Sequence, residues 1–224
     1  MKYDWILFDA DDTLFHFDAF QGMQLMFERK GVTFSEQDYL NYQSVNKPLW
    51  VDYQNGEISA EQLKHIRFQS WADKLGTTTQ ELNRAFLQAM ADICAPLPGA
   101  KDLIEALAGK VRLGIITNGF TELQRVRLER TGMAEYFELV TISEQVGVAK
   151  PDPMIFAHTY QQMGEPEKHR VLMVGDNPHS DIVGGLNFGL ETCWLNMAGH
   201  PQIEGIAPQY TVDSLHQLKQ ILLA

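Results

Sequence analysis

The sequence predicts an α/β fold with a core that is a Rossmann-like, doubly wound parallel sheet and an inserted all-helical cap. Two observations predict it. Short apolar runs rich in β-branched residues recur along the chain, and a turn and a helical pattern follow each of them, as in sheets covered by helices on both faces. In addition, about a hundred residues separate the first run from the second, far more than one crossover needs. The predicted strands span residues 5–8, 111–116, 139–142, 171–174 and 192–195.

The long interval reads as several helices. Phe20, Met23 and Phe27 have helical spacing. Further apolar stripes, which we expect to be buried, are formed by Leu63, Ile66 and Trp71 and by Leu82, Phe86, Met90 and Ile93. Three segments have the pattern of a capping box, at Ser35 and Asp38, Ser59 and Gln62, and Thr78 and Glu81. Pro96 and Pro98 end the run. We therefore expect a core of residues 1–15 and 99–224, and a helical cap of residues 16–98.

Composition limits the partners. The chain has 224 residues, of which 45% are hydrophobic, and its 18 Lys and Arg against 29 Asp and Glu give a net charge of −11. This is the wrong sign for a protein that neutralises many phosphates of DNA or RNA, although a single phosphorylated metabolite stays open. The two cysteines, Cys94 and Cys193, have no CxxC spacing and are expected in the core. No signal peptide or membrane span is evident, so we expect a cytoplasmic protein.

Two acidic residues directly follow the first strand. Residues i and i+2 of an extended chain project to the same side, so Asp9 and Asp11 should converge beyond the strand's carboxyl end, where open parallel sheets bind ligands. An ionised aspartate attacks phosphorus without a neighbouring base, and a second carboxylate can protonate the leaving group and then activate water. A divalent cation would relieve their repulsion. Alternation points Asp12 away, which favours a structural turn. Thr13 is expected to orient the nucleophile, with a local Ser/Thr turn as the alternative.

Three later segments have matching chemistry. Thr117, Asn118 and Gly119 follow the second strand, where a hydroxyl and backbone amides can hold phosphate oxygens. Lys150 lies in a loop and can neutralise the nucleophile and the phosphate. Asp176 and Asp181 follow the strand at 171–174 and offer carboxylates to Mg²⁺. Three simpler interpretations stay open: Thr117 as a strand end, Lys150 as a surface lysine, and Asp181 as a carboxylate favoured by a helix dipole.

These segments resemble the haloacid dehalogenase (HAD) superfamily, in order and over most of the chain: DxDxT from Asp9, a Thr at 117, a Lys at 150 and GDxxxxD from Gly175. The resemblance implies a Mg²⁺-dependent phosphomonoesterase that works through an aspartyl-phosphate, with Mn²⁺ or another divalent ion as a substitute. It makes Asp9 the nucleophile and Asp11 the general acid/base, and Thr117 and Lys150 contacts of the phosphate. It assigns the metal to Asp9, the Asp11 carbonyl and Asp176, with Asp181 assisting.

A narrower resemblance links nearly the whole chain to the bacterial pyrimidine 5′-nucleotidases of this superfamily. It rests on DADDTLF at 9–15, the cap segment 46–56, IITNGF at 115–120, VGVAKP at 146–151 and CWLN at 193–196. It implies hydrolysis of dUMP, UMP and dTMP, including a house-cleaning role against non-standard pyrimidine nucleotides. The cap would close over the substrate and select it. Trp50, Tyr53 and Trp71 are candidates for stacking on a base or for core packing, and Asn46 and Lys47 for contacts to a base edge or phosphate.

Other functions stay open. One is a phosphatase for a different small phosphometabolite, such as a sugar phosphate or phosphoglycolate. A 2-haloacid dehalogenase shares the Asp nucleophile, but it needs no Mg²⁺ and lacks a second acid like Asp11. A signalling receiver domain also combines Asp, Thr, Lys and Mg²⁺ and holds a phosphate without turnover, but receivers are uncapped and about half this length. A catalytically idle binding protein on the same scaffold is a further alternative.

Overall fold

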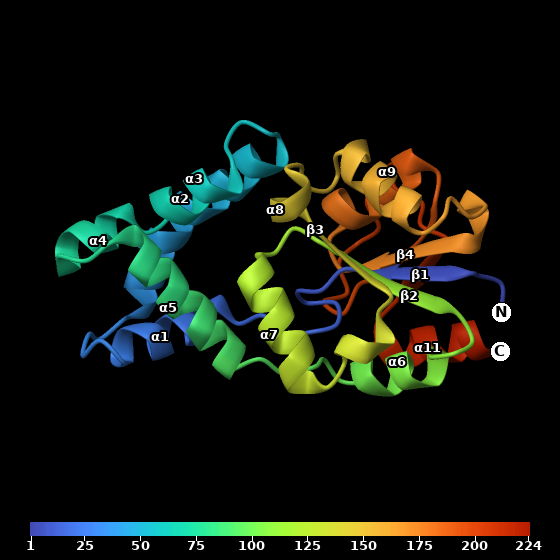
Figure 1. Ribbon diagram of the computed structural model, residues 1–224, viewed down its shortest axis with the longest axis horizontal. Helices are drawn as coiled ribbons and strands as arrows, with labels where there is room; N and C mark the ends of the chain where they lie inside the picture. Colours follow the sequence, from blue (N-terminus) through green and yellow to red (C-terminus); the bar gives the residue numbers. More distant parts are fainter.

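The computed structural model describes residues 1–224 and has a sheet with its covering helices at one end and a helical body at the other (Figure 1). The six strands are all parallel, in the order β3-β2-β1-β4-β5-β6, which confirms the predicted α/β fold. The strands are β1 (Trp5–Phe8), β2 (Arg112–Thr117), β3 (Leu139–Ile142), β4 (Val171–Gly175), β5 (Glu191–Leu195) and β6 (Tyr210–Val212). The first five lie within one residue of their predicted bounds, whereas β6 was not predicted.

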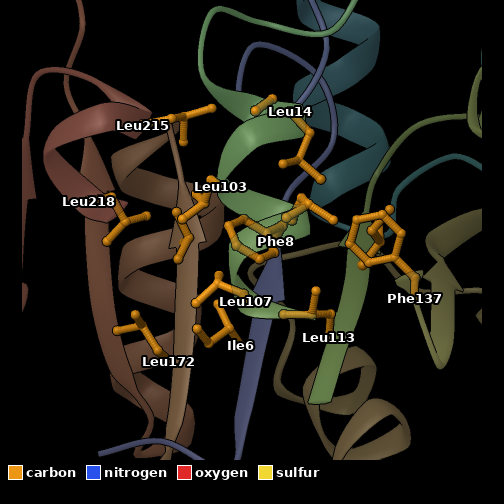
Figure 2. Close-up of a cluster of buried hydrophobic side chains, with 14 of the residues drawn as sticks. Ile6, Phe8, Leu14, Leu103, Leu107, Leu113, Phe137, Leu172, Leu215 and Leu218 are labelled. Carbon is orange, nitrogen blue, oxygen red and sulfur yellow. The ribbon is translucent and has the colours of Figure 1, made fainter. Parts of the chain in front are cut away.

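Helices cover both faces of the sheet, as a doubly wound architecture requires. Alternate side chains of β1 enter different clusters, because successive residues of a strand point to opposite faces. Ile6 and Phe8 pack with residues of α6 (Ala100–Leu107) and α11 (Leu215–Leu223) on one face (Figure 2). Trp5 and Leu7 pack with residues of α9 (Pro153–Gln162) on the other.

Five helices occupy the interval between β1 and α6, as predicted for the cap. They form the end of the molecule that lies away from both chain termini (Figure 1). All three predicted capping boxes are present, with the hydroxyls of Ser35, Ser59 and Thr78 accepting from backbone N–H groups. The limits of the two parts at residues 15/16 and 98/99 stay a prediction. The helices are α1 (Ala19–Glu28), α2 (Glu36–Gln54), α3 (Ala60–Ile66), α4 (Gln69–Leu75) and α5 (Thr79–Asp92).

The cap has a hydrophobic cluster of its own, which contains Met23, Phe27, Trp71 and Phe86. The expectation that Ile66 is buried there was wrong, because its exposed fraction is 44%. The chain turns between α3 and α4, and Phe68 fills the interior in its place with 0% exposure.

Side chains join the cap to the core near α8 (Ser143–Val146). The hydroxyl of Tyr53 donates to Ser143 Oγ at 2.8 Å. Lys64 pairs with Glu144, whose other carboxylate oxygen accepts from the Thr121 N–H at 2.9 Å, at the start of α7 (Thr121–Thr131). These contacts fix the cap above the carboxyl ends of the strands. The remaining helical segments are α10 (Gly184–Phe188), η1 (Ala134–Tyr136), η2 (Lys168–Arg170) and η3 (Pro178–Val183).

The two cysteines lie in or against the hydrophobic cluster on one face of the sheet. Cys193 is fully buried, and Cys94 is half-buried against the same cluster; neither forms a disulfide. None of the helices combines the length and the apolar character needed to cross a lipid bilayer.

Candidate active site

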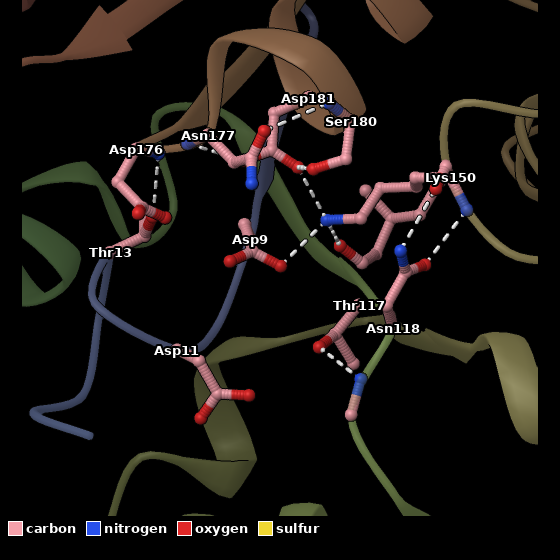
Figure 3. A network of polar contacts seen from close by, with 12 residues as sticks. Asp9, Asp11, Thr13, Thr117, Asn118, Lys150, Asp176, Asn177, Ser180 and Asp181 are labelled. Carbon is pink, nitrogen blue, oxygen red and sulfur yellow. Dashed lines mark hydrogen bonds and ion pairs between the residues drawn. The ribbon is translucent and has the colours of Figure 1, made fainter. Parts of the chain in front are cut away.

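The predicted segments meet at the carboxyl ends of three neighbouring strands. Asp9 follows β1, Thr117 ends β2 and Asp176 follows β4, and the sheet order places these strands side by side (Figure 3). Lys150 reaches the same point from the loop before α9. Residues up to 167 positions apart in the sequence therefore share one site, because parallel strands end at the same edge.

Lys150 is buried between two carboxylates. Its Nζ lies 2.6 Å from Asp9 Oδ1 and 2.7 Å from Asp181 Oδ1, and it also donates to the Ile116 carbonyl at 2.6 Å (Figure 3). With 2% of its side chain exposed, it is not an ordinary surface lysine. The Asn118 side chain forms two hydrogen bonds with the backbone of Lys150: it accepts from Lys150 N at 2.8 Å and donates to Lys150 O at 2.9 Å. The sequence did not predict this role for the Asn118 side chain.

Three carboxylates gather beside Lys150. Oxygens of Asp9, Asp176 and Asp181 lie within 4.8 Å of one another. Burial raises the pKa of Asp9, with Lys150 opposing the shift and the other two carboxylates adding to it. Burial and the charge of Asp181 raise the pKa of Asp176 to about 7. Since one lysine faces three acids, the cluster fits a hard divalent cation such as Mg²⁺, which binds oxygen ligands and would offset the remaining negative charge.

Asp176 is held by groups from two distant segments. Thr13 Oγ1 donates to Asp176 Oδ1 at 3.1 Å and accepts from Asp176 N at 3.0 Å. The indole of Trp194 donates to the Asp176 carbonyl at 2.9 Å. The expectation that Thr13 orients Asp9 was therefore wrong, because its hydroxyl is used by Asp176.

Asp181 belongs to the interior of the cluster. It is 0% exposed, and its carboxylate accepts from Asn177 N at 3.1 Å and from Ser180 Oγ at 3.2 Å. Because Asp181 forms an ion pair with Lys150, its role is not limited to the interaction with a helix dipole considered above. A Cβ on Gly175 would lie 2.2 Å from Asp181 Oδ2, so only glycine fits before Asp176.

Asp11 lies apart from the carboxylate cluster (Figure 3). Its Oδ1 pairs with Arg127 Nη1 at 2.5 Å. Arg127 is 1% exposed, lies over the Phe15 ring at 4.7 Å, and donates to Gln124 Oε1. The pair leaves Asp11 Oδ2 free of hydrogen bonds to the protein. The metal role of Asp11 concerns its carbonyl and stays a prediction.

The second-strand loop is more closed than expected. Gly119 N donates to Thr117 Oγ1 at 3.0 Å, so this amide, predicted to bind phosphate, is engaged by the Thr117 hydroxyl. A Cβ on Gly119 would lie 2.2 Å from Gln124 Nε2, so a side chain there would require the Gln124 side chain to move. Thr117 is 1% exposed and still borders the cavity described next.

A cavity of about 230 Å³ lies between this edge and the cap. Of the three aromatic candidates only Trp50 borders it, since the Tyr53 hydroxyl bonds to Ser143 and Trp71 packs on Phe27 with ring centroids 4.4 Å apart. Of the two polar candidates Asn46 and Lys47, Asn46 borders the cavity, whereas Lys47 is exposed and does not. The residues that line the cavity from the core include Asp9, Asp11, Thr117, Asn118, Gly119, Lys150 and Asp176, and those from the cap include Tyr42, Asn46, Trp50, Gln54, Arg67 and Phe86.

Comparison with known sequences identifies the family of the chain. The family model described as haloacid dehalogenase-like hydrolase matches residues 3–189. The chain is 59% identical over 222 residues to pyrimidine 5′-nucleotidase YjjG of Escherichia coli (strain K12), covering 99% of each chain. It is 35% identical over 235 residues to pyrimidine 5′-nucleotidase PynA of Streptococcus pneumoniae, covering 99% of this chain and 96% of that one. The chain belongs to the haloacid dehalogenase-like hydrolase family.

Solved structures share the fold over the whole chain. The protein YfnB of Bacillus subtilis, whose crystal structure is described as bound to magnesium and as revealing interdomain movement, superposes with a TM-score of 0.85 at 28% identity, covering 99% of both chains. An L-2-haloacid dehalogenase of Xanthobacter autotrophicus superposes with a TM-score of 0.74 at 20% identity and 99% coverage of both chains, a likeness in fold alone.

Proposed function

We propose that this enzyme is a Mg²⁺-dependent 5′-nucleotidase that removes phosphate from pyrimidine nucleoside monophosphates. The observation that carries the phosphatase is the buried cluster of Asp9, Lys150, Asp176 and Asp181 beneath the cap. It combines an anionic nucleophile, a fixed cation and oxygen ligands for a metal at the edge where parallel sheets bind ligands. The cytoplasmic location stays a prediction.

In the first step Asp9 attacks phosphorus, and the bond from phosphorus to the 5′-oxygen breaks. Asp11 gives its proton to that oxygen, so the nucleoside leaves as a neutral alcohol. The ion pair with Arg127 uses one oxygen of Asp11 and leaves Oδ2 for this transfer. The product on the enzyme is an acyl phosphate on Asp9.

In the second step Asp11 takes a proton from water, and the water oxygen attacks phosphorus. The bond between phosphorus and Asp9 breaks, which releases inorganic phosphate and restores the carboxylate. Lys150 supports both steps because its Nζ is fixed 2.6 Å from Asp9. The Thr117 hydroxyl and the backbone amide of Asn118 are proposed to hold phosphate oxygens in the transition state, whereas the Gly119 amide would first have to leave Thr117 Oγ1.

Asp9, Asp176 and Asp181, with the Asp11 carbonyl, would hold Mg²⁺. When bound, the ion would neutralise charge on the transferring phosphoryl group and screen it from the carboxylates. Mn²⁺ or another divalent ion of similar preference is expected to support the same chemistry.

The proposal of a pyrimidine nucleotide as the substrate rests on similarity to known proteins. Two proteins named pyrimidine 5′-nucleotidase match nearly all of this chain, at 59% and 35% identity. A cavity that Trp50 and Phe86 border from the cap offers apolar surface to a planar base. UMP, dUMP and dTMP, together with non-standard pyrimidine nucleotides, are the proposed substrates.

The test is phosphate release from these nucleotides, from sugar phosphates and from phosphoglycolate, with Mg²⁺ and with a chelator. We expect Mg²⁺-dependent turnover of the pyrimidine nucleotides, lowered by about 10⁴-fold or more in Asp9→Asn. The exposed Asp213→Asn is the matched control and should be fully active. Unchanged turnover in Asp9→Asn would refute the mechanism, and turnover confined to sugar phosphates or phosphoglycolate would refute the nucleotidase.

A further inference from the structure

Arg67 is a buried cation without an acid partner. It follows the last turn of α3, is 5% exposed, and forms no ion pair. Its Nη2 donates to the side-chain oxygen of Asn83, but Nε is buried without any hydrogen-bond partner. Buried charges in proteins are ordinarily paired, and buried donors ordinarily bonded, because the lost hydration is costly. An unpaired guanidinium therefore indicates a partner from outside the chain.

The surroundings fix the guanidinium in place. It lies between aromatic rings, at 5.0 Å from the centroid of Phe68, 5.3 Å from Phe86 and 5.0 Å from Phe120. These rings offset part of its charge through cation–π attraction but accept no hydrogen bond in its plane. Burial lowers the pKa of Arg67, and the nearby Tyr42 opposes that shift. The N–H groups are thus oriented in advance for an acceptor.

Arg67 borders the same cavity as Asp9 and Lys150, but from the cap. Neither Asp9 nor Lys150 is within ion-pair or hydrogen-bond distance of Arg67. The phosphate of a substrate lies at the core side, next to Asp9, so its other end faces the cap. Trp50 of the cap and Phe120 of the loop after β2, with ring centroids 5.4 Å apart, also border this cavity.

We propose that Arg67 donates a hydrogen bond to the carbonyl oxygen at ring position 4 of uracil or thymine, and thereby selects these bases over cytosine. The inference rests on the proposed nucleotidase function. Position 4 lies across the ring from the nitrogen that carries the sugar, so it is the part of the nucleotide farthest from the phosphate. Cytosine has an amino group there, which is a donor. A guanidinium has donors only, so it cannot bond to that group and would stay unsatisfied.

The experiment compares kcat/KM for UMP, CMP and p-nitrophenyl phosphate, which has no base, in the presence of Mg²⁺. The variants are Arg67→Met and Arg67→Lys, with the exposed Arg84→Met of α5 as the matched control. We expect the wild type and Arg84→Met to favour UMP over CMP by about 10- to 100-fold, the range for a hydrogen bond to a charged group. Arg67→Met should lower only the UMP value, so that this ratio falls to about 1, and Arg67→Lys should keep part of the preference.

Turnover of p-nitrophenyl phosphate within about twofold of wild type reports that Arg67→Met is folded and its phosphate site intact. An equal loss for UMP and p-nitrophenyl phosphate would overturn the inference, since Arg67 would then serve the phosphate or the fold. The inference would also be overturned if the wild type hydrolysed UMP and CMP equally well, and this measurement needs no variant. Failure of the nucleotidase function is distinguishable, because the wild type would then hydrolyse p-nitrophenyl phosphate but neither nucleotide.

Discussion

Lys150 is the one cation in contact with the carboxylates of Asp9 and Asp181. The Asn118 side chain forms two hydrogen bonds with the backbone of Lys150. The loop after β2 therefore helps to position the loop that carries the ammonium group. Burial opposes its charge, but the two carboxylates outweigh this and raise the pKa of Lys150. The lysine is therefore charged throughout the physiological range, both as a partner of the nucleophile and as a structural group.

Replacing Lys150 by Met should cost stability as well as activity. The change leaves buried carboxylates without their cation, for which a loss of about 3–5 kcal/mol in the free energy of unfolding is typical. Chemical denaturation measures it, with the exposed Lys47→Met as the control. A Lys150→Met protein as stable as the control would show that the ion pairs contribute nothing net.

Single residues differ in how far the sequence predicts them. Asp9 and Asp176 follow apolar runs, and the rule that parallel strands end at one edge is enough to bring them together. Arg127 gave no such signal, because its partner Asp11 is 116 positions away and the contact depends on how α7 packs. Arg67 was missed for the same reason, since its aromatic neighbours come from α5 and from the loop after β2.

Among the elements, α3 is short but carries much of the cap's chemistry. It has seven residues, too few for a helix that is stable alone, and it precedes Arg67 and contains Lys64. Its first turn depends on the capping box of Ser59 and Gln62, in which the Ser59 hydroxyl accepts from Gln62 N and the Gln62 side chain accepts from Ser59 N. The cap is thus tied to the core through an element that local hydrogen bonds hold in shape.

Ser59→Ala should lower the free energy of unfolding by about 1 kcal/mol, the usual cost of removing an N-cap hydroxyl. Thermal or chemical unfolding of this variant measures the effect. The exposed Ser70→Ala within α4 is the matched control, because its hydroxyl has no capping role. Equal stability of the two variants would mean that the box does not stabilise α3.

Elements with strong periodicity were predictable, and those without it were not. The capping boxes and the five apolar runs depend on neighbouring residues, so the sequence specifies them locally. β6 has only three residues, of which Tyr210 is half-buried and Thr211 exposed, so no apolar run marked it. The exposure of Ile66 was also unpredictable, because it depends on the turn that leads from α3 into α4.

At the scale of the whole molecule, the site lies between the core and the cap. Its three carboxylates are only partly neutralised by Lys150. The core supplies the carboxylates and Lys150, while the cap encloses the cavity and adds Arg67. The contacts of Tyr53 with Ser143 and of Lys64 with Glu144 join the two parts beside the cavity. Because the metal would bind ionisable carboxylates of the folded protein, the stabilisation that it gives should depend on pH.

The stabilisation by Mg²⁺ should increase with pH. Burial and the charge of Asp181 raise the pKa of Asp176 from 3.8 to about 7. The folded protein then holds this proton more tightly than the unfolded chain, so the metal-free protein loses stability as pH rises between these two values. Mg²⁺ binds the ionised carboxylate, so the rise in Tm on adding Mg²⁺ should be larger at about pH 8 than at about pH 6.

Thermal unfolding with Mg²⁺ and with a chelator at the two pH values measures this difference. Asp176→Asn, which cannot ionise, should show a smaller rise in Tm, and this rise should change less with pH than in the wild type, where Asp176 titrates in addition to Asp9. An equal rise at both pH values in the wild type would contradict the link between Asp176 and the metal.

The central claim is that Asp9 becomes phosphorylated during turnover. The most direct test uses Asp11→Asn, in which p-nitrophenol leaves without help but the second step lacks its base, so the phosphorylated enzyme should accumulate. After reaction with p-nitrophenyl phosphate and Mg²⁺, borohydride reduces an aspartyl phosphate to homoserine, which mass spectrometry locates in the chain. We predict homoserine at position 9. Release of p-nitrophenol with Asp9 unmodified, or reduction at another aspartate, would contradict the account.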